Sequence, residues 1–295
     1  MSNSKKAWKY KQKTAPYIFI SPFYVLFLVF MIYPILFSFR ASFTSWNGVN
    51  DMKWVGLQNY INLVQDKIFL QSIINGVVMF IMYVPIMLTL ALFIAVLLNK
   101  PNVKFKKFFR ASIYIPNITS AVAIAFVFGL AFDTKYGFIN KMLTSINLPA
   151  VSWMGTAFGA RFAICLLVMW RYLGYNMILM MAGLQTISES IVEAAKIDGA
   201  NGFHVFSRIT IPLMKPVILF CTVLSTIGTF SLFTEPLILT GGGPLYKTTT
   251  SVLYIYTESF SHLKMGYASS LAYAFFVLMI ILSLIQFKLS SMSDK

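Results

Sequence analysis

The sequence has 295 residues, of which 58% are hydrophobic and only 11% are charged. Soluble domains carry about a quarter charged residues, so this composition excludes an ordinary soluble protein and indicates a membrane protein. The net charge of +15 does not indicate nucleic-acid binding, because the lysines flank apolar segments and form no basic face with interleaved aromatic residues.

The polar N-terminus, residues 1–15, is rich in lysine and is followed by an apolar segment over 17–39. A cleaved signal peptide is the alternative interpretation, but its apolar region would cover only about 7–15 residues and would end in small residues. Here the apolar segment ends at Phe39 and Arg40. We therefore predict a basic N-terminus and an uncleaved first membrane span.

Further apolar segments are long enough to cross a membrane, since a helix needs about 20 residues to span roughly 30 Å of hydrocarbon. These segments run over 72–98, 111–132, 162–184, 213–237 and 268–287. The sequence therefore predicts an all-α membrane protein whose six transmembrane helices form one domain over 16–290, followed by a short tail over 291–295.

Six spans place both termini on the same side of the membrane, and lysine and arginine indicate which side. With the N-terminus inside, fifteen of these residues fall on cytosolic segments and seven on outer segments, while Arg161 and Arg171 are left to the fourth span. The positive-inside rule therefore predicts that both termini and the loop 185–212 are cytosolic.

Polar residues within the predicted fourth span form the first candidate site. Arg171 lies about ten residues into this span, near mid-depth at about 1.5 Å per residue. Facing lipid there would cost at least ~2.5–3.5 kcal/mol, so Arg171 should face protein or water. Tyr175 lies on the same helical face, with Tyr172 and Asn176 beside it. One hypothesis is a pore face whose tyrosines stack on sugar rings; the alternative is a buried arginine neutralised by backbone carbonyls or by an acid of a neighbouring span.

Glu235 and Pro236 lie near the outer end of the predicted fifth span. We add Glu235 to the hypothetical substrate pathway, because a carboxylate at this depth can gate or line the exit from an external vestibule. An interfacial carboxylate at a proline break is the alternative interpretation.

The cytosolic loop before the fifth span has a pattern of helix signals. Thr186 and Glu189 have the spacing of a capping box, which predicts the start of a short helix. Asp198 and Gly199 predict a turn, since glycine accepts the positive φ that a chain reversal needs. An ordinary solvated loop is the alternative.

A second short helix is predicted after this turn. Asn201 has the right side chain to cap its start. Pro212 and Pro216 are predicted to mark its end and the start of the next membrane span. The whole segment, 193–216, therefore predicts a helix, a glycine corner and another helix.

This segment resembles the Glu-Ala-Ala loop in the membrane subunits of binding-protein-dependent ABC importers. The resemblance implies a type I ABC importer permease fold and a coupling helix that seats in a groove of an ATP-hydrolysing subunit. Pro216 completes the pattern, and the residues that the resemblance implies for ATPase coupling are Glu193, Ala194, Ala195, Asp198, Gly199, Ala200, Ile209 and Pro212.

Two predicted outer segments resemble the carbohydrate-uptake branch of this family, which includes maltose and glycerol-phosphate permeases. They are Val55–Tyr60 (VGLQNY), before the second span, and Thr240–Pro244 (TGGGP), after the fifth. The glycine run is typical of one of the two paired membrane subunits in that branch. The alternative for Gly241–Gly243 is a flexible external turn.

The chain has no recognisable catalytic constellation. Its nearest approach to a Walker A phosphate loop is Gly241–Thr248, which has Tyr246 where the pattern requires a glycine before Lys247. We therefore predict that the chain is not an enzyme and binds no cofactor or metal, and that ATP and Mg belong to a partner ATPase. Neither the cysteines nor the histidines have metal-ligand spacing, and these are Cys165, Cys221, His204 and His262.

The resemblance implies the permease subunit of an ATP-driven importer that moves a carbohydrate, in particular an oligosaccharide, by alternating access across a bacterial-type plasma membrane. The implied partners are a second, different permease subunit, a cytosolic ATPase dimer, an extracytoplasmic solute-binding protein and the lipid bilayer, with no nucleic acid. The alternative is an autonomous secondary transporter for a polar solute, which would need intramembrane acids or broken helices for its coupling ions. Here the acids lie nearly all in predicted loops.

Overall fold

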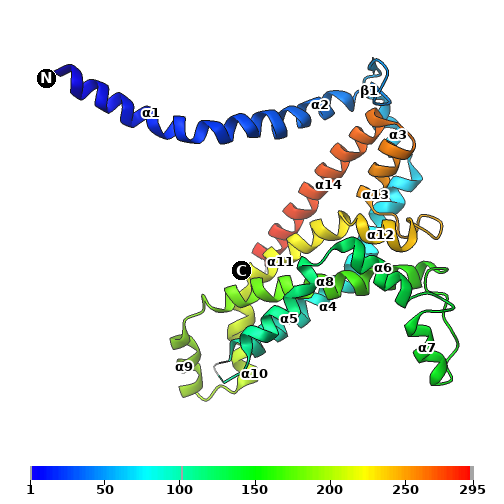
Figure 1. The fold of residues 1–295 in the computed structure, drawn as a ribbon. Coiled ribbons are helices and arrows are strands. Elements are labelled where there is room, and N and C mark those ends of the chain that lie inside the picture. The colour runs from blue at the N-terminus through cyan, green and yellow to red at the C-terminus, as the bar shows by residue number, and fades with distance from the viewer. Residues whose placement is uncertain (1, 101, 293–295) are drawn as a thin grey trace. The chain divides into compact units, whose positions relative to one another are not determined.

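The computed structural model of the protein describes residues 2–100 and 102–292. The chain divides into two compact units, one made of Met1–Gln65 and Thr257–Ala274 and the other of Asp66–Tyr256 and Phe275–Lys295. Almost all regular structure in the described residues is helical, as Figure 1 shows. The all-α fold class predicted from the apolar segments is therefore confirmed.

The first unit begins with a long helix made of three consecutive pieces. These are α1 (Ser2–Phe27), the π-helical turn η1 (Leu28–Ile32) and α2 (Tyr33–Ala41). The π turn lies just before Pro34 at the start of α2. Proline has no N–H and clashes with the carbonyl four residues back, so a wider turn lets the helix continue past it.

A short hairpin and a helix follow in the first unit. Strands β1 (Thr44–Ser45) and β2 (Lys53–Trp54) pair antiparallel, and α3 (Gln58–Val64) comes next. The buried Asn59 donates hydrogen bonds from Nδ2 to the carbonyl oxygens of Ser42 (2.8 Å) and Thr44 (2.9 Å). The VGLQNY segment thus fastens α3 to the hairpin.

The core of the second unit consists of three long helices. They are α4 (Lys67–Asn99), α8 (Ala157–Leu184) and α11 (Ile211–Phe230), and α4 packs against both of the others. The Asp66 side chain caps α4 by accepting from two backbone N–H groups of its first turn. Fully buried apolar residues between these helices include Met79, Met87, Ile164, Leu167, Met177 and Met214.

The predicted third span, 111–132, corresponds to two helices instead of one. Helices α5 (Lys106–Ile118) and α6 (Ala121–Ala131) meet at a bend of 92°. Thr119 is extended at the break, and the Ser120 side chain caps α6. A serine that satisfies a free N–H group lets a new helix start in a different direction.

The predicted fifth span, 213–237, is also interrupted. Helix α11 ends at Phe230, and α12 (Thr234–Thr240) is a separate helix that packs against α6 and α8. Pro236 cannot donate to the carbonyl of Leu232, which would be its helical partner. That carbonyl instead accepts a hydrogen bond from Thr250 Oγ1.

The remaining helices connect these elements. They are α7 (Phe138–Ser145), α9 (Glu189–Ile197), α10 (Gly202–Val205) with the π turn η2 (Phe206–Thr210), α13 (Ser251–Tyr256) with η3 (Thr257–Ser261), and α14 (Met265–Met292). The described residues contain five helices long and apolar enough to cross a membrane, or six if α5 and α6 count as one span. The predicted tail, 291–295, lies largely outside the described residues.

Candidate functional site

Arg171 lies in the middle of α8 and forms an ion pair with Glu235 of α12. Arg171 Nη1 is 2.7 Å from Glu235 Oε1, and the two side chains are only 15% and 4% exposed. The guanidinium carbon also lies 5.2 Å from the centre of the Tyr172 ring, within the range of a cation–π contact. The structure therefore shows Arg171 neutralised by an acid of a neighbouring helix, and its place in the substrate pathway stays a prediction.

A cavity of about 260 Å³ lies beside this pair, between α4, α8 and α11. It is lined by three tyrosines together with polar and apolar residues of the same helices and of the segment just after α11, and these residues are Tyr83, Met87, Val168, Tyr172, Tyr175, Asn176, Leu224, Ser225, Gly228 and Leu232. Three residues of the predicted pathway thus share one cavity, whereas Arg171 and Glu235 form the ion pair next to it. Tyr83 and Ser225 also line the cavity but were not predicted, although polar groups within apolar spans are a signal that could have found them.

Asn176 is a polar group in this cavity with capacity for a ligand. It is only 2% exposed, and its Nδ2 donates to the Tyr172 carbonyl oxygen at 3.1 Å. Its Oδ1 is buried and has no hydrogen-bond partner among the described residues. Leaving a buried acceptor unpaired costs about 1–3 kcal/mol. A hydroxyl group or a water molecule that entered the cavity would satisfy this oxygen.

The cytosolic segment after α8 contains the predicted short helices. The prediction of a capping box at Thr186 and Glu189 is wrong. Helix α9 begins only at Glu189, and the Thr186 hydroxyl donates to the Gly183 carbonyl oxygen at 2.8 Å. Thr186 lies so close to the end of α8 that a carbonyl of its last turn is the nearer partner. The glycine corner is confirmed, since Gly199 has φ +83°.

The second short helix is capped as predicted. Asn201 Oδ1 accepts from the His204 backbone N–H at 2.9 Å. The prolines do not separate this helix from the next span, because α10, η2 and α11 form one continuous helix over Gly202–Phe230. The π turn η2 comes just before Pro212, as η1 does before Pro34, and Pro216 lies inside α11.

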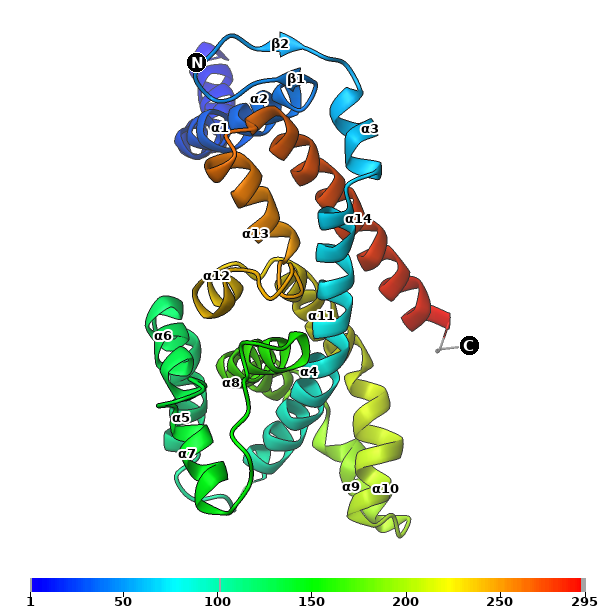
Figure 2. The ribbon, with the colours of Figure 1, turned by 90° about the vertical axis from the view of Figure 1, so that its right-hand side faces the viewer.

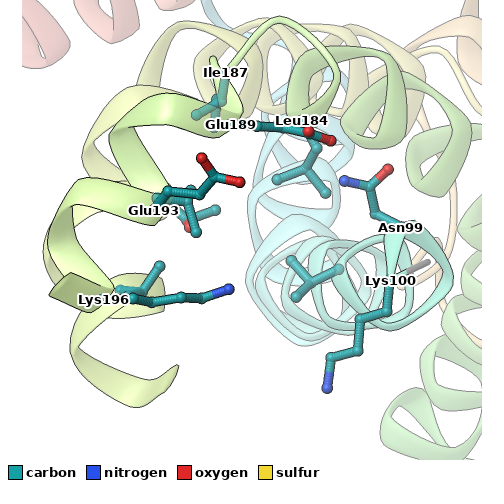
Figure 3. Close-up of a pocket in the computed structure, with 11 residues that line it drawn as sticks. Asn99, Lys100, Leu184, Ile187, Glu189, Glu193 and Lys196 are labelled. Carbon is teal, nitrogen blue, oxygen red and sulfur yellow. The ribbon is translucent and has the colours of Figure 1, made fainter. Parts of the chain in front are cut away.

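Helices α9 and α10 lie together at one end of the second unit (Figures 1 and 2). A pocket of about 390 Å³ separates α9 from the end of α4. Figure 3 shows the side chains of Glu193 and Lys196 pointing into it from α9, and the Asn99 amide pointing in from α4. Within the described residues, neither Glu193 nor Lys196 has an ion-pair partner. The charged side chains of Glu193 and Lys196 are therefore able to form ion pairs with another molecule.

The residues predicted for ATPase coupling lie on both sides of the glycine corner. Ala195, Ala200 and Ile209 are half-buried. The others are exposed, namely Glu193, Ala194, Asp198, Gly199 and Pro212. Because alanine and glycine have little or no side chain, another backbone can approach this surface closely.

The TGGGP segment begins a folded loop, residues 241–250, which we call the glycine-rich loop. Gly241 and Gly242 both have positive φ, +58° and +87°. A Cβ at Gly242 would lie 2.5 Å from Thr249 Oγ1 of the same loop. Thr249 Oγ1 in turn donates to the Gly242 carbonyl oxygen at 3.1 Å.

Asn75 of α4 attaches this loop to the helices. Its Nδ2 donates to the carbonyl oxygens of Tyr246 (2.7 Å) and Thr249 (2.8 Å). Its Oδ1 accepts from Arg161 Nη2 (2.7 Å) and Gln71 Nε2 (2.9 Å). The amide thus uses two donors and two acceptor positions. The glycine-rich loop is therefore bound to α4 and α8, unlike the flexible turn considered as an alternative.

The glycine-rich loop and the α9 pocket lie at opposite ends of α4. Asn75 contacts the loop, and Asn99 lines the pocket. At about 1.5 Å per residue, the helix between them is about 36 Å long, slightly more than the roughly 30 Å of membrane hydrocarbon. The two segments therefore face opposite sides of a membrane that α4 crosses.

No group of three or more His, Cys, Asp and Glu side chains among the described residues could hold a metal ion. Cys165 and Cys221 are both buried and unpaired. The site therefore consists of a polar cavity within apolar helices, a folded loop at one end and exposed short helices at the other. This arrangement defines a multi-pass membrane permease.

Residues 64–291 match the model of the family described as "Binding-protein-dependent transport system inner membrane component", and the chain belongs to this family. It is 39% identical to the lactose transport system permease protein LacF of Rhizobium radiobacter, over 92% of each chain. It is 32% identical to the arabinooligosaccharides transport system permease protein AraP of Bacillus subtilis, over 95% of this chain and 90% of that protein.

A third relative is the trehalose/maltose transport system permease protein MalF of Thermococcus litoralis, 31% identical over 97% of each chain. Among solved structures, the fold is similar to a chain of a bacterial ABC transporter for the acidic polysaccharide alginate, with a TM-score of 0.79 at 21% identity over 98% of this chain and 100% of that one. A chain of the alginate transporter in complex with a pentasaccharide-bound periplasmic protein gives a TM-score of 0.80 at 21% identity, over 95% of each chain.

Proposed function

We propose that the chain is the permease subunit through which an ATP-driven importer passes a carbohydrate, and that the cavity at Asn176 contacts this substrate. The observation that carries the proposal is the buried, unpaired Asn176 Oδ1 in a cavity lined by three tyrosines. Sugar rings offer apolar faces that stack on aromatic rings and hydroxyl groups that donate to amide oxygens. The names of the relatives, which refer to lactose, arabinooligosaccharides and trehalose or maltose, support the same substrate class.

We infer the protein partners of this chain from the segments at the two ends of α4. We infer that α9 and its glycine corner dock on a cytosolic ATPase, because small residues lie exposed beside the unpaired charges of Glu193 and Lys196. ATP and Mg then belong to that partner. The glycine-rich loop would face an extracytoplasmic solute-binding protein. Such a protein is part of the alginate system, whose solved complex includes a periplasmic protein.

A second permease subunit would complete the pathway, and the positive-inside distribution of lysine and arginine supports cytosolic termini. Alternating access requires a ligand or partner to bind two conformations with different affinity. We infer that ATP-driven closure of the ATPase moves the α9–α10 segment relative to α4, across the pocket that now separates them.

The test compares Asn176→Ala with Asn50→Ala, a change in an exposed loop. Each complete importer is reconstituted in proteoliposomes, and uptake of labelled saccharides is measured with ATP inside. Loss of one hydrogen bond to substrate should lower uptake at limiting saccharide about tenfold for Asn176→Ala, which corresponds to about 1.4 kcal/mol. Asn50→Ala should leave uptake unchanged. Unaltered uptake by an assembled Asn176→Ala complex would exclude the proposed contact.

A further inference from the structure

Helix α5 has one face against α8 and one face that looks away from it. The inner face packs very closely, because a Cβ at Gly174 of α8 would overlap the carbonyl group of Ile113. The same Cβ would lie 2.8 Å from the Cα atom of Tyr114. Side chains on the opposite side of α5 are therefore directed away from α8.

The outer face of α5 is basic at its start and apolar along the rest of its length. Lys107 and Phe108 begin it, and Ile115 and Ile118 follow at helical spacing on the same side. Phe108 is 66% exposed, Ile115 54% and Ile118 70%. Phe105, just before the helix, is 78% exposed. Along the helix axis, basic side chains thus come first and exposed apolar side chains follow. A phospholipid has the matching order, because its anionic headgroup is followed by apolar chains.

Within the described residues, the basic side chains at the start of α5 form no ion pair. Four basic residues lie within seven positions, and these are Lys104, Lys106, Lys107 and Arg110. The sequence has no aspartate or glutamate from Lys67 through Phe132. Arg110 Nε is buried and lacks a hydrogen-bond partner in the described part of the chain. An anionic group is therefore the complementary ligand.

We propose that the start of α5 is a binding site for an anionic phospholipid. Lys104 and Lys107, which are both exposed and lie three residues apart, bind the headgroup phosphate. The acyl chains lie along Phe108 and Ile115. Clusters of basic residues directly beside a membrane span attract anionic headgroups. A soluble anion would need the cations but not the exposed apolar face that continues from them, so the structure favours a lipid.

The test is native mass spectrometry of the complete importer complex with equal amounts of phosphatidylglycerol and phosphatidylcholine. The wild-type complex should retain phosphatidylglycerol in preference. In Lys104→Gln/Lys107→Gln this preference should fall about fivefold for each charge removed, the contribution of one basic residue near an anionic surface. Lys135→Gln/Lys141→Gln removes the same charge from exposed positions in and before α7 and should keep the preference.

A second measurement needs no variant. Raising the salt concentration from about 0.1 to 1 M shortens the Debye length from about 10 to 3 Å, so the wild-type complex should lose most of its preference for phosphatidylglycerol. Equal retention of the two lipids, an equal fall in both double variants, or a preference that salt leaves intact would each overturn the proposal. Efficient displacement of the lipid by inorganic phosphate would show an anion site and would overturn it too.

Discussion

Arg171 and Glu235 lie 64 residues apart in the sequence and form an ion pair at 2.7 Å that is largely shielded from solvent. The pair joins the middle of α8 to the first turn of α12. It therefore holds in place the short helix that follows the break in the predicted fifth span. Its carboxylate and guanidinium compensate each other where lipid or protein, not bulk water, surrounds them.

Removing one partner of this pair should be more harmful than removing both. Arg171→Met leaves Glu235 buried without a counter-charge, which costs about 3–5 kcal/mol. Arg171→Met/Glu235→Gln leaves no buried charge and should recover most of that loss. The measurement is the thermal unfolding midpoint of the purified complex for the wild type, for Arg171→Met, for Glu235→Gln and for the double variant.

Full uptake and unchanged stability in the Arg171→Met complex would contradict the role of the ion pair. If the single and double variants were equally unstable, the loss would come from packing of the side chains, because the uncompensated charge would then make no difference.

Replacing Asn75 should release the glycine-rich loop. Asn75→Leu keeps the size of the side chain but removes both donors to the loop carbonyls of Tyr246 and Thr249. Each unpaired group costs about 1–3 kcal/mol if it stays buried, so the loop should open to water. Hydrogen exchange of residues 241–250 should become at least tenfold faster, whereas the protection of α8 away from Arg161 should not change. Unaltered exchange in the loop would show that Asn75 does not hold it.

Glu193→Ala should weaken the coupling between transport and ATP hydrolysis. Glu193 is exposed, points into the α9 pocket and has no ion-pair partner within the described residues, so its removal should leave membrane insertion intact. Substrate-stimulated ATPase activity and uptake of the complex should both fall.

The control for this prediction is Glu189→Ala, one helical turn earlier on α9 and also exposed. It removes the same charge from outside the Glu-Ala-Ala pattern. Normal substrate-dependent ATPase activity with Glu193→Ala, or an equal decrease with Glu189→Ala, would contradict a specific role for Glu193.

Gly199 and Gly202 form a matched pair for a backbone test. A Cβ at either position would meet nothing within 4 Å, but only Gly199 has a positive φ, +83°. Gly199→Ala should therefore cost about 1–2 kcal/mol through the left-handed conformation alone. Gly202→Ala, at the first position of α10, should be neutral or slightly stabilising, because alanine favours helix.

The readout is hydrogen exchange across α9 and α10 in the complete complex. Faster exchange with Gly199→Ala alone is the expected result. Similar exchange in both variants would mean that the corner does not need the left-handed conformation to keep α9 and α10 in place.

Much of the fold could be predicted from local patterns. Long apolar segments predicted helices where α4, α8 and α14 lie, since the length of an apolar run is a property of the chain alone. The corner at Gly199 and the cap at Asn201 were predicted correctly because both depend on residues within a few positions. The resemblance of the Glu-Ala-Ala segment indicated the family to which the chain belongs.

The predictions that differ from the structure concern side chains with more than one possible hydrogen-bond partner. Thr186 has the spacing of a capping residue, yet a carbonyl at the end of α8 was the nearer acceptor. The third predicted span has enough apolar residues for one helix, but Ser120 starts a new one at a bend of 92°. Composition alone does not record such choices.

Tertiary structure alone decided the contacts between distant segments. The sequence determined that Arg171 needed protein or water around it, because an arginine in lipid is costly, but its pairing with Glu235 required α12 to fold back onto α8. In the same way, the sequence shows Asn75 only as an amide within an apolar span, whereas its hydrogen bonds to the glycine-rich loop are seen only in the structure. Hydropathy and turn preference are local properties, whereas a buried hydrogen bond or ion pair depends on which distant groups packing brings within reach.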